Sequence, residues 1–152
     1  MLSVWWDQSG VVHHELLPKN MTINADLYCQ QLQRVKAAIE EKRPRLNNEV
    51  LLQHDNARPH VAKMTKSVIE ELGWEILPHP PYSPDLAPTD FHLFRSLSNH
   101  LSGHIFESDA AISAFIDEFF DKKPKTFYRD GIQKLPERWS KIVEQSGEYL
   151  ID

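Results

Sequence analysis

The sequence has one cysteine, no long hydrophobic run and fewer basic than acidic residues. Cys29, as the single cysteine, cannot form an internal disulfide. No apolar stretch approaches the roughly 18 residues of a membrane-spanning helix. The first residues, MLSVWWDQSG, lack the basic flank and long apolar core of a signal peptide. These absences favour a cytosolic or nuclear protein without a disulfide framework, and they exclude membrane-spanning classes.

The charge balance argues against a protein that coats nucleic acid by itself. The chain has 22 Asp and Glu against 17 Lys and Arg, which gives a net charge of −5. Neutralising phosphates requires clustered Lys and Arg. Two explanations keep a DNA-related function open: some of the acids bind metal ions, or a basic DNA-reading domain is missing from this chain.

The size and composition predict one folded domain over residues 1–152. A chain of 152 residues with 41% hydrophobic content is an ordinary globular sequence. A chain of this size buries about 68–70% of the surface that its unfolded form exposes, enough for a full core. The sequence shows no internal repeat, linker or low-complexity segment.

Hydrophobic periodicity predicts the order β-hairpin, helix, strand, helix, strand, helices. Alternation predicts the hairpin over residues 2–17, and residues 18–24 form a loop or a short third strand. Asn24 is the expected N-cap of a helix that Pro44 stops. The run EVLLQHDN predicts a strand buried on both faces and ending at Asp55.

The second half of the chain is expected to be mainly helical. A helix over HVAKMTKSVIEELG ends at Gly73, WEILP is a short strand, and the prolines of HPPYSPDLAP predict a loop. Further helices start near Asp90, at the N-cap Ser108 and within GIQKLPERWSKIVEQSG. The inward residues expected for the HVAKMTKSVIEELG helix are Val61, Met64, Val68 and Leu72.

Three aspartates occupy comparable places in this pattern. Asp7 and Asp55 lie at the ends of predicted strands, and Asp90 lies in the first turn of a helix. In an α/β layer, strand ends and helix starts meet at one edge of the sheet, where ligand sites form. Three converging carboxylates repel one another unless a cation lies between them, and Mg²⁺ prefers oxygen ligands.

Each aspartate taken singly has a purely structural explanation. Asp7 can cap the hairpin, Asp55 with Asn56 can form an Asx turn, and Asp90 can satisfy free helix N–H groups. For any one of them the structural explanation is favoured. It is the combination of the three that favours a metal site.

Four motifs carry a family resemblance. VWWDQSG, HDNARPHVA, PHPPYSPDLAPTDFHLF and FYRDGIQKLPERWSKIVEQSGEYL resemble, in order and spacing, the catalytic domain of mariner-family transposases. Asp55 and Asp90 have 34 residues between them, the spacing that defines the mariner subgroup. The resemblance covers essentially the whole chain. It implies an α/β, ribonuclease H-like fold with a mixed central β-sheet flanked by helices.

The resemblance also implies the chemistry and the working residues. Asp7, Asp55 and Asp90 match the three catalytic carboxylates, which would hold two Mg²⁺ ions, with Mn²⁺ as a substitute. The implied activity is cleavage of phosphodiester bonds at transposon ends and strand transfer into TA target sites. Asp85 matches a non-ligating position, and Ser83-Pro84-Asp85 has the composition of a tight turn.

The implied partner is double-stranded DNA with inverted-repeat ends, bound by a homodimer in the nucleus. The segment PKNMTINADLY matches a region that reaches the partner subunit in the DNA-bound dimer. Family members carry N-terminal helix-turn-helix modules, and this chain starts directly before the first catalytic strand. The chain alone is therefore expected to choose no DNA sequence and to be weakly active.

Several other residues are weaker candidates. His54 and Asn56 flank Asp55 and could support the metal site, although a packing role is equally open. The spacing of the histidines matches no standard zinc template. A basic stretch near an aromatic residue could contact DNA, although most exposed lysines are solvated surface; it comprises Lys122, Lys123, Lys125 and Arg129.

Three functions from different classes stay open on the sequence. The first is an active transposase catalytic domain. The second is a domesticated or remnant domain that binds DNA or protein without transposition, against which the retained three aspartates argue, because some domesticated copies have lost the third acid to Asn. The third is a stand-alone ribonuclease H-like nuclease.

Overall fold

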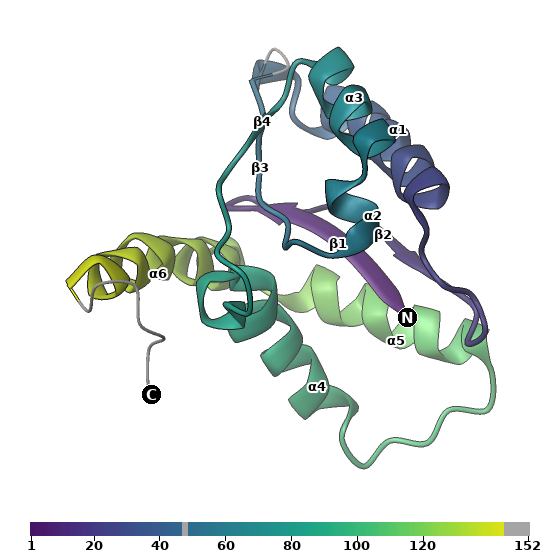
Figure 1. The fold of residues 1–152 in the computed structure, drawn as a ribbon. Helices are drawn as coiled ribbons and strands as arrows, with labels where there is room; N and C mark the ends of the chain where they lie inside the picture. The colour runs from purple at the N-terminus through teal and green to yellow at the C-terminus, as the bar shows by residue number, and fades with distance from the viewer. Residues whose placement is uncertain (47–48, 145–152) are drawn as a thin grey trace. The chain divides into compact units, whose positions relative to one another are not determined.

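The computed structural model describes residues 1–46 and 49–144. The chain comprises two compact units, and Figure 1 labels its helices and strands. The first, called here the N-terminal unit, comprises Met1–Trp5 and Val12–Tyr82. The second, called the C-terminal unit, comprises Trp6–Val11 and the chain from Ser83 onward. None of the helices in the described ranges is long and apolar enough to span a bilayer.

The chain begins with the predicted β-hairpin. Strand β1 (Leu2–Asp7) pairs with β2 (Gly10–Leu16), and Leu17 N donates to Met1 O at 2.7 Å beyond the open end. Gly10, directly after the turn, has φ 121°, a conformation that L-residues rarely adopt. The hairpin prediction is confirmed, and the following residues 18–24 form no strand.

Helix α1 (Ala25–Lys42) begins and ends where its sequence predicts. The Asn24 side chain accepts a hydrogen bond of 2.8 Å from Leu27 N, which satisfies one of the free N–H groups of the first turn. Pro44 ends the helix and opens a short 3₁₀ turn, η1 (Pro44–Leu46). The N-cap prediction is therefore correct.

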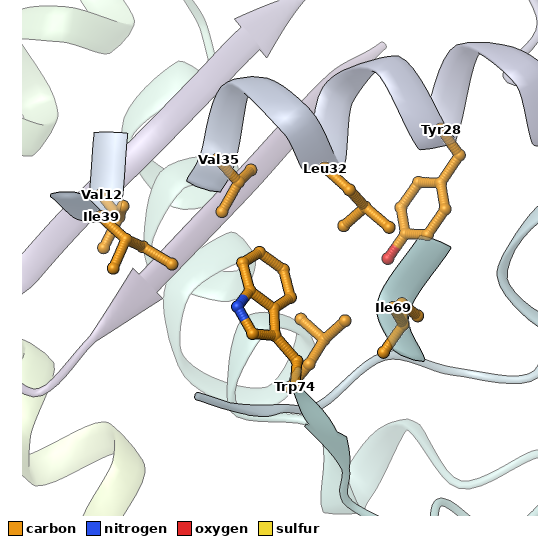
Figure 2. Packing of buried hydrophobic residues seen from close by; sticks show 8 residues of the cluster. Val12, Tyr28, Leu32, Val35, Ile39, Ile69 and Trp74 are labelled. Atoms are coloured by element: carbon orange, nitrogen blue, oxygen red, sulfur yellow. The ribbon is translucent and has the colours of Figure 1, made fainter. Parts of the chain in front are cut away.

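The core of the N-terminal unit lies along one face of α1 (Figure 2). Every third or fourth residue of that helix is buried, as its amphipathic pattern requires. Trp74 and Ile69 pack against this face together with residues from the strands. The buried cluster comprises Val12, Tyr28, Leu32, Val35, Ile39, Leu52, Ile69 and Trp74.

The strand predicted to end at Asp55 is shorter than expected. Strand β3 covers Leu51–Leu52 and pairs in parallel with β4 (Glu75–Ile76). The prediction of burial on both faces was wrong, because Leu51 is 60% exposed while Leu52 is buried. Asp55 consequently lies in the loop after the strand and not at its last residue.

In the described residues, the strands form two separate sheets of two strands each, β1–β2 and β3–β4. A continuous mixed central sheet, as predicted, is therefore not found as a single hydrogen-bonded ladder in this part of the chain. Strands β3 and β4 pair at two positions, Leu51 with Glu75 and Leu52 with Ile76. The mixture of helices with both hairpin and parallel pairing agrees with the predicted α/β class.

The helix predicted over HVAKMTKSVIEELG is divided in two. Helix α2 (Arg58–Val61) and α3 (Lys63–Leu72) are separated by Ala62, which has extended backbone angles of φ −59° and ψ 149°. Of the expected inward residues, Val61 and Met64 are 38% and 45% exposed, whereas Val68 and Leu72 are partly buried and pack against the core. Thr65 and Ile69 are buried instead.

The end of α3 follows the sequence signal. Gly73 adopts φ 76° in the left-handed region, and its backbone N–H bonds back to the last turn. Glycine adopts this conformation without the steric cost that a Cβ would impose. The predicted C-terminal glycine of this helix is confirmed.

The described part of the C-terminal unit is mainly helical. The loop after Tyr82 contains a 3₁₀ turn, η2 (Pro84–Leu86), and continues into a π-helical segment, η3 (Thr89–Phe94), and α4 (Arg95–Leu101). Helix α5 (Asp109–Lys122) starts at Ser108, whose side chain accepts from Ala111 N as predicted. Helix α6 (Lys125–Glu144) is one helix with Pro136 inside it.

The buried side chains of this unit are largely leucines and aromatic residues. Leu86 and Leu93 have no exposed surface. Phe91 and Phe94 of the η3 segment are half-buried. The buried hydrophobic residues of the unit are Leu86, Leu93, Leu97, Ile116, Phe119, Phe120 and Tyr128.

Candidate active site

Asp55 is held in a defined turn although its side chain is 57% exposed. Its Oδ1 accepts a hydrogen bond of 3.0 Å from Ala57 N, which makes an Asx turn. The same oxygen lies 2.6 Å from His60 Nδ1. Partial burial raises the pKa of Asp55, but the hydrogen bond from Ala57 and the nearby His60 outweigh this effect and lower the pKa overall. The carboxylate is therefore ionised at neutral pH.

His60 belongs to a stack of three rings in the N-terminal unit. Its ring lies 4.9 Å from the His54 ring at an angle of 4°, and 4.3 Å from the Tyr28 ring. The Tyr28 hydroxyl lies 2.8 Å from His54 Nδ1. Tyr28 belongs to α1 and is 4% exposed, so the stack begins in the hydrophobic core.

The protonation states in this stack follow from burial. Burial and the neighbouring His60 lower the pKa of His54 to about 4, so its imidazole is neutral at pH 7. Burial, followed by the charge of Asp55, raises the pKa of the Tyr28 phenol. The phenol therefore keeps its proton, and its oxygen lies at hydrogen-bond distance from His54 Nδ1.

The two residues that flank Asp55 have separate contacts. His54 contacts Tyr28 and His60, as described above, and thereby adjoins the residue that binds Asp55. Asn56 Nδ2 donates to the backbone carbonyl of His79 at 2.7 Å, which ties the Asp55 loop to the segment after β4. Support of a metal site by His54 and Asn56 stays a prediction.

Asp7 and Asp90 both belong to the C-terminal unit. Asp7 is the last residue of β1, is half-buried, and accepts a hydrogen bond of 2.8 Å from Ser9 N. Asp90 is the second residue of η3, is exposed, and its backbone N donates to Ala87 O at 2.8 Å. The structure thus places both acids where the sequence predicted, at a strand end and a helix start.

A direct hydrogen bond connects the segments that carry these two acids. Trp6 Nε1 donates to Thr89 Oγ1 at 2.9 Å. Trp6 immediately precedes Asp7, and Thr89 immediately precedes Asp90. The end of β1 and the start of η3 are therefore neighbours within this unit.

Helix α6 supports the η3 segment through Arg138. The guanidinium carbon lies 4.2 Å from the centroid of the Phe91 ring, and Nη1 donates to the carbonyl of Asp85 at 3.1 Å. The backbone of Asp85 thus helps to anchor the turn that leads to Asp90. This agrees with the predicted shaping role of the Asp85 segment.

His92 is a second connection between η3 and α6. Its Nε2 lies 2.6 Å from the carbonyl oxygen of Phe127, and its ring stacks on Trp6 with centroids 6.4 Å apart. Gly131 approaches the same ring so closely that a Cβ there would lie 2.2 Å from a ring carbon. The absence of a side chain at Gly131 is what permits this packing.

The four predicted DNA-contact residues have different surroundings. Lys122 pairs with Glu118 one helical turn away, and Arg129 lies 4.0 Å from Asp130. Lys125 is exposed at the start of α6. Contact of any of them with DNA stays a prediction.

Lys123 is the exception, because its ammonium group packs on aromatic rings. The Nζ atom lies 5.1 Å from the centroid of Phe119 and 4.8 Å from that of Phe127. Such cation–π contacts orient a lysine side chain and stabilise its position. Its side chain therefore also has a packing role.

The oxygen-rich donor set fits a hard divalent cation. Asp7 and Asp90 in one unit and Asp55 in the other offer carboxylate oxygens, the ligands that Mg²⁺ and Mn²⁺ prefer. Among the described residues, no three His, Cys, Asp or Glu side chains are grouped so as to hold an ion. Convergence of the three acids stays a prediction.

Sequence reasoning missed the residues that hold the acids in place. The histidines were weighed only as possible zinc ligands. The contact of His60 with Asp55 was missed, although His60 lies five residues after Asp55 in the sequence. Trp6, Thr89 and Arg138 make contacts between elements distant in sequence, and no local pattern identifies such partners.

Comparison with known proteins places the chain in a family. A family model described as "Transposase (partial DDE domain)" matches residues 1–49. The chain is 46% identical over 153 residues to the mariner Mos1 transposase of Drosophila mauritiana, covering 99% of this chain and 44% of that protein. It is 39% identical over 152 residues to the human histone-lysine N-methyltransferase SETMAR, covering 99% of this chain and 22% of that protein. The chain thus spans less than half of either relative.

Solved structures match over nearly the whole chain. The Mos1 catalytic domain, solved with Raltegravir and Mn, matches with a TM-score of 0.95 and 46% identity, covering 99% of this chain and 76% of that one. The Mos1 paired-end complex with Mn matches with a TM-score of 0.96 and 47% identity, covering 99% and 44%. The predicted ribonuclease H-like fold is thereby confirmed. The chain belongs to the mariner transposase family and corresponds to its catalytic domain.

Proposed function

We propose that this chain is the catalytic domain of a mariner-like DNA transposase, a metal-dependent endonuclease and strand transferase. The observation that carries the proposal is the 46% identity to the Mos1 catalytic domain over 99% of the chain. That domain was solved with Mn and with Mg. The proposed cofactors here are two Mg²⁺ ions, with Mn²⁺ as a substitute.

The proposed ligands are Asp7, Asp55 and Asp90. When bound, two divalent ions stabilise the attacking and leaving oxygens of an in-line phosphoryl displacement. The chain contributes the carboxylate oxygens of these three residues. The lowered pKa of Asp55 keeps its carboxylate charged, and the Trp6–Thr89 hydrogen bond holds the segments of Asp7 and Asp90 together.

The proposed partner is double-stranded DNA, namely inverted-repeat transposon ends and a TA target. Mos1 has been solved as a paired-end complex and as a strand transfer complex, and these structures match 99% of this chain. By extension from these complexes, we propose that this chain binds DNA as a homodimer and acts in the nucleus. Lys125 and Arg129 are exposed in the described structure, and Lys122 and Lys123 complete the proposed DNA contacts.

A second candidate is a binding module without transposition. The 39% identity to SETMAR, whose name is that of a histone methyltransferase, favours this possibility. In that case the domain would bind DNA or protein, and its carboxylates would hold no catalytic ions. Metal binding separates the two candidates.

The test is calorimetric titration of the chain with Mn²⁺ and Mg²⁺, alone and with a short DNA duplex. Asp90→Asn removes one proposed ligand charge at an exposed position, and Asp85→Asn is the matched control on the same segment. Binding by the wild type and Asp85→Asn that is weakened in Asp90→Asn supports the transposase. Absent binding in all three, with and without duplex, favours the binding module.

A further inference from the structure

We infer that His60 is a positioning residue for Asp55, fixing the orientation of its carboxylate from the core of the N-terminal unit. The inference deepens the proposed function and rests on it as far as the metal role of Asp55 is concerned. The part of the inference that concerns structure, namely that His60 fixes the Asp55 side chain, rests on contacts within the N-terminal unit.

The first step is that Asp55 needs external support. It follows a strand of two residues, lies in a loop, and its side chain is 57% exposed. An exposed side chain on a loop ordinarily samples several rotamers, and fixing one costs conformational entropy. The Asx turn with Ala57 is a local bond, and the bond from His60 adds a partner in helix α2.

The second step concerns which oxygen is engaged. Both hydrogen bonds that Asp55 accepts from described residues fall on Oδ1, at 3.0 Å from Ala57 N and 2.6 Å from His60 Nδ1. Two donors on one oxygen define the plane and the direction of the carboxylate. The arrangement assigns Oδ2 as the oxygen that faces a ligand.

The third step is that His60 is itself fixed. Its ring is packed 4.3 Å from Tyr28 and 4.9 Å from His54, with the two imidazoles nearly parallel. Tyr28 is a buried residue of α1, and its hydroxyl fixes His54 in turn. The position of an exposed carboxylate is therefore determined by rings that are anchored in the hydrophobic core.

The backbone that carries His60 is also anchored. The fully buried Thr65 donates from Oγ1 to the carbonyl of Pro59 at 2.5 Å, directly before His60. Helix α2 has only four residues and no side-chain cap, so this bond from α3 supplies support that the helix lacks. Ring packing and backbone anchoring together leave His60 little freedom.

His60 is not itself a metal ligand in this arrangement. Its Nδ1 lies 2.6 Å from Asp55 Oδ1, and a ring nitrogen that carries a hydrogen has no free lone pair for a metal ion. The hydrogen on Nδ1 is required for the bond to the carboxylate. Its role is to support a ligand, as groups around metal-binding side chains commonly do.

Two substitutions separate the hydrogen bond from the ring packing. His60→Phe keeps an aromatic ring in the stack and removes the Nδ1 donor. His60→Asn removes the ring and keeps an amide donor at nearly the same distance from the backbone. If the hydrogen bond positions Asp55, His60→Asn retains the effect and His60→Phe loses it; a role in packing alone predicts the reverse.

The first readout needs no metal. Three-bond couplings from N and C′ to Cγ of Asp55, measured by NMR on the labelled full chain, report whether its χ1 angle adopts one rotamer. We expect one rotamer in the wild type and in His60→Asn, and averaged couplings in His60→Phe. Unchanged single-rotamer couplings in a folded His60→Phe would overturn the inference.

The second readout is Mn²⁺ affinity by calorimetry on the same three proteins. Loss of a supporting hydrogen bond typically weakens metal binding about 10–100-fold, and we expect this in His60→Phe and rescue in His60→Asn. Averaged couplings in His60→Phe, together with no metal binding by the wild type, would support the positioning role of His60 and overturn the metal role of Asp55. Should His60→Phe fail to unfold cooperatively, His60→Leu replaces it, because leucine has nearly the shape of the asparagine in His60→Asn and lacks the donor.

Discussion

Trp6 Nε1 donates a hydrogen bond of 2.9 Å to Thr89 Oγ1, so the residues that immediately precede Asp7 and Asp90 are bonded to each other. The indole ring is further packed by His92 and Tyr128. A strand end and a helix start that are far apart in sequence thus share one polar contact. We expect that contact to help hold the segments of the two acids together.

Replacing Thr89 with valine tests this expectation. Thr89→Val keeps the shape and removes the acceptor, which leaves the partly buried indole N–H of Trp6 without this partner. An intramolecular hydrogen bond contributes about 0.5–1.5 kcal/mol, and we expect a loss of that order in the free energy of unfolding in urea. We also expect weaker Mn²⁺ binding, and Thr89→Ser, which keeps the hydroxyl, should behave as wild type. Equal behaviour of the two variants would contradict this role of the bond.

Substitution of Gly131 should destabilise the C-terminal unit. The Cβ of Gly131→Ala would meet the His92 ring at 2.2 Å, far inside contact distance. Overpacking of this kind typically costs about 1–3 kcal/mol. The measurement is chemical unfolding of Gly131→Ala, His92→Ala and the double variant. A double variant in which the two costs simply add would show that the ring is not the obstacle.

The core of the N-terminal unit gives a matched pair of leucines. Leu32 in α1 is fully buried, whereas Leu51 in β3 is 60% exposed. We expect Leu32→Ala to lower the free energy of unfolding by about 2–5 kcal/mol, and Leu51→Ala to change it by about 0.5 kcal/mol or less. Urea unfolding followed by circular dichroism measures both. Comparable losses would show that Leu51 becomes buried in solution.

The stack around His54 predicts a dependence of stability on pH. The pKa of His54 is lowered to about 4 from an ordinary 6.5, so between these values the unfolded chain binds more protons than the folded one. Stability is therefore full above about pH 6.5 and falls as the pH decreases toward about 4. The lowered pKa of Asp55 also makes the folded chain less stable as the pH decreases, at still lower pH.

His54→Phe should reduce this dependence. The measurement is the difference in unfolding free energy between pH 7 and pH 5, which we expect to be smaller in the variant than in the wild type. His14→Phe serves as the control, because it makes the same exchange on strand β2, outside the ring stack around His54. An identical pH profile for wild type and His54→Phe would contradict the burial of a neutral imidazole.

Local signals in the sequence predicted the element order and several boundaries correctly. Asn24, Ser108 and Gly73 act through hydrogen bonds or backbone angles within one helix end, so their role is visible in a few adjacent residues. The break at Ala62 was missed, because alanine is a good helix former and no local signal marks the break. The length of β3 was missed because it depends on its pairing with β4.

The same distinction applies to the candidate site. Asp7, Asp55 and Asp90 could be named from motif and position, and the structure places Asp7 at a strand end and Asp90 at a helix start. The groups that hold them depend on tertiary contacts: His60 on the ring stack and Thr89 on Trp6. Sequence patterns indicate which chemistry a residue type can perform, whereas the distant residues that hold it in place are identified only by the packing of the folded chain.

The division of the first hairpin between the two units has a consequence for synthesis on the ribosome. Trp6–Val11 belongs to the C-terminal unit, but 71 residues separate Val11 from Ser83, where the rest of that unit begins. At roughly 5–20 residues per second, translation of the intervening segment takes about 4–14 seconds. During that interval the nascent chain exposes Trp6 before Thr89, His92 and Tyr128 have been made. The packing of Trp6 in the C-terminal unit thus awaits the synthesis of residues that lie much later in the chain.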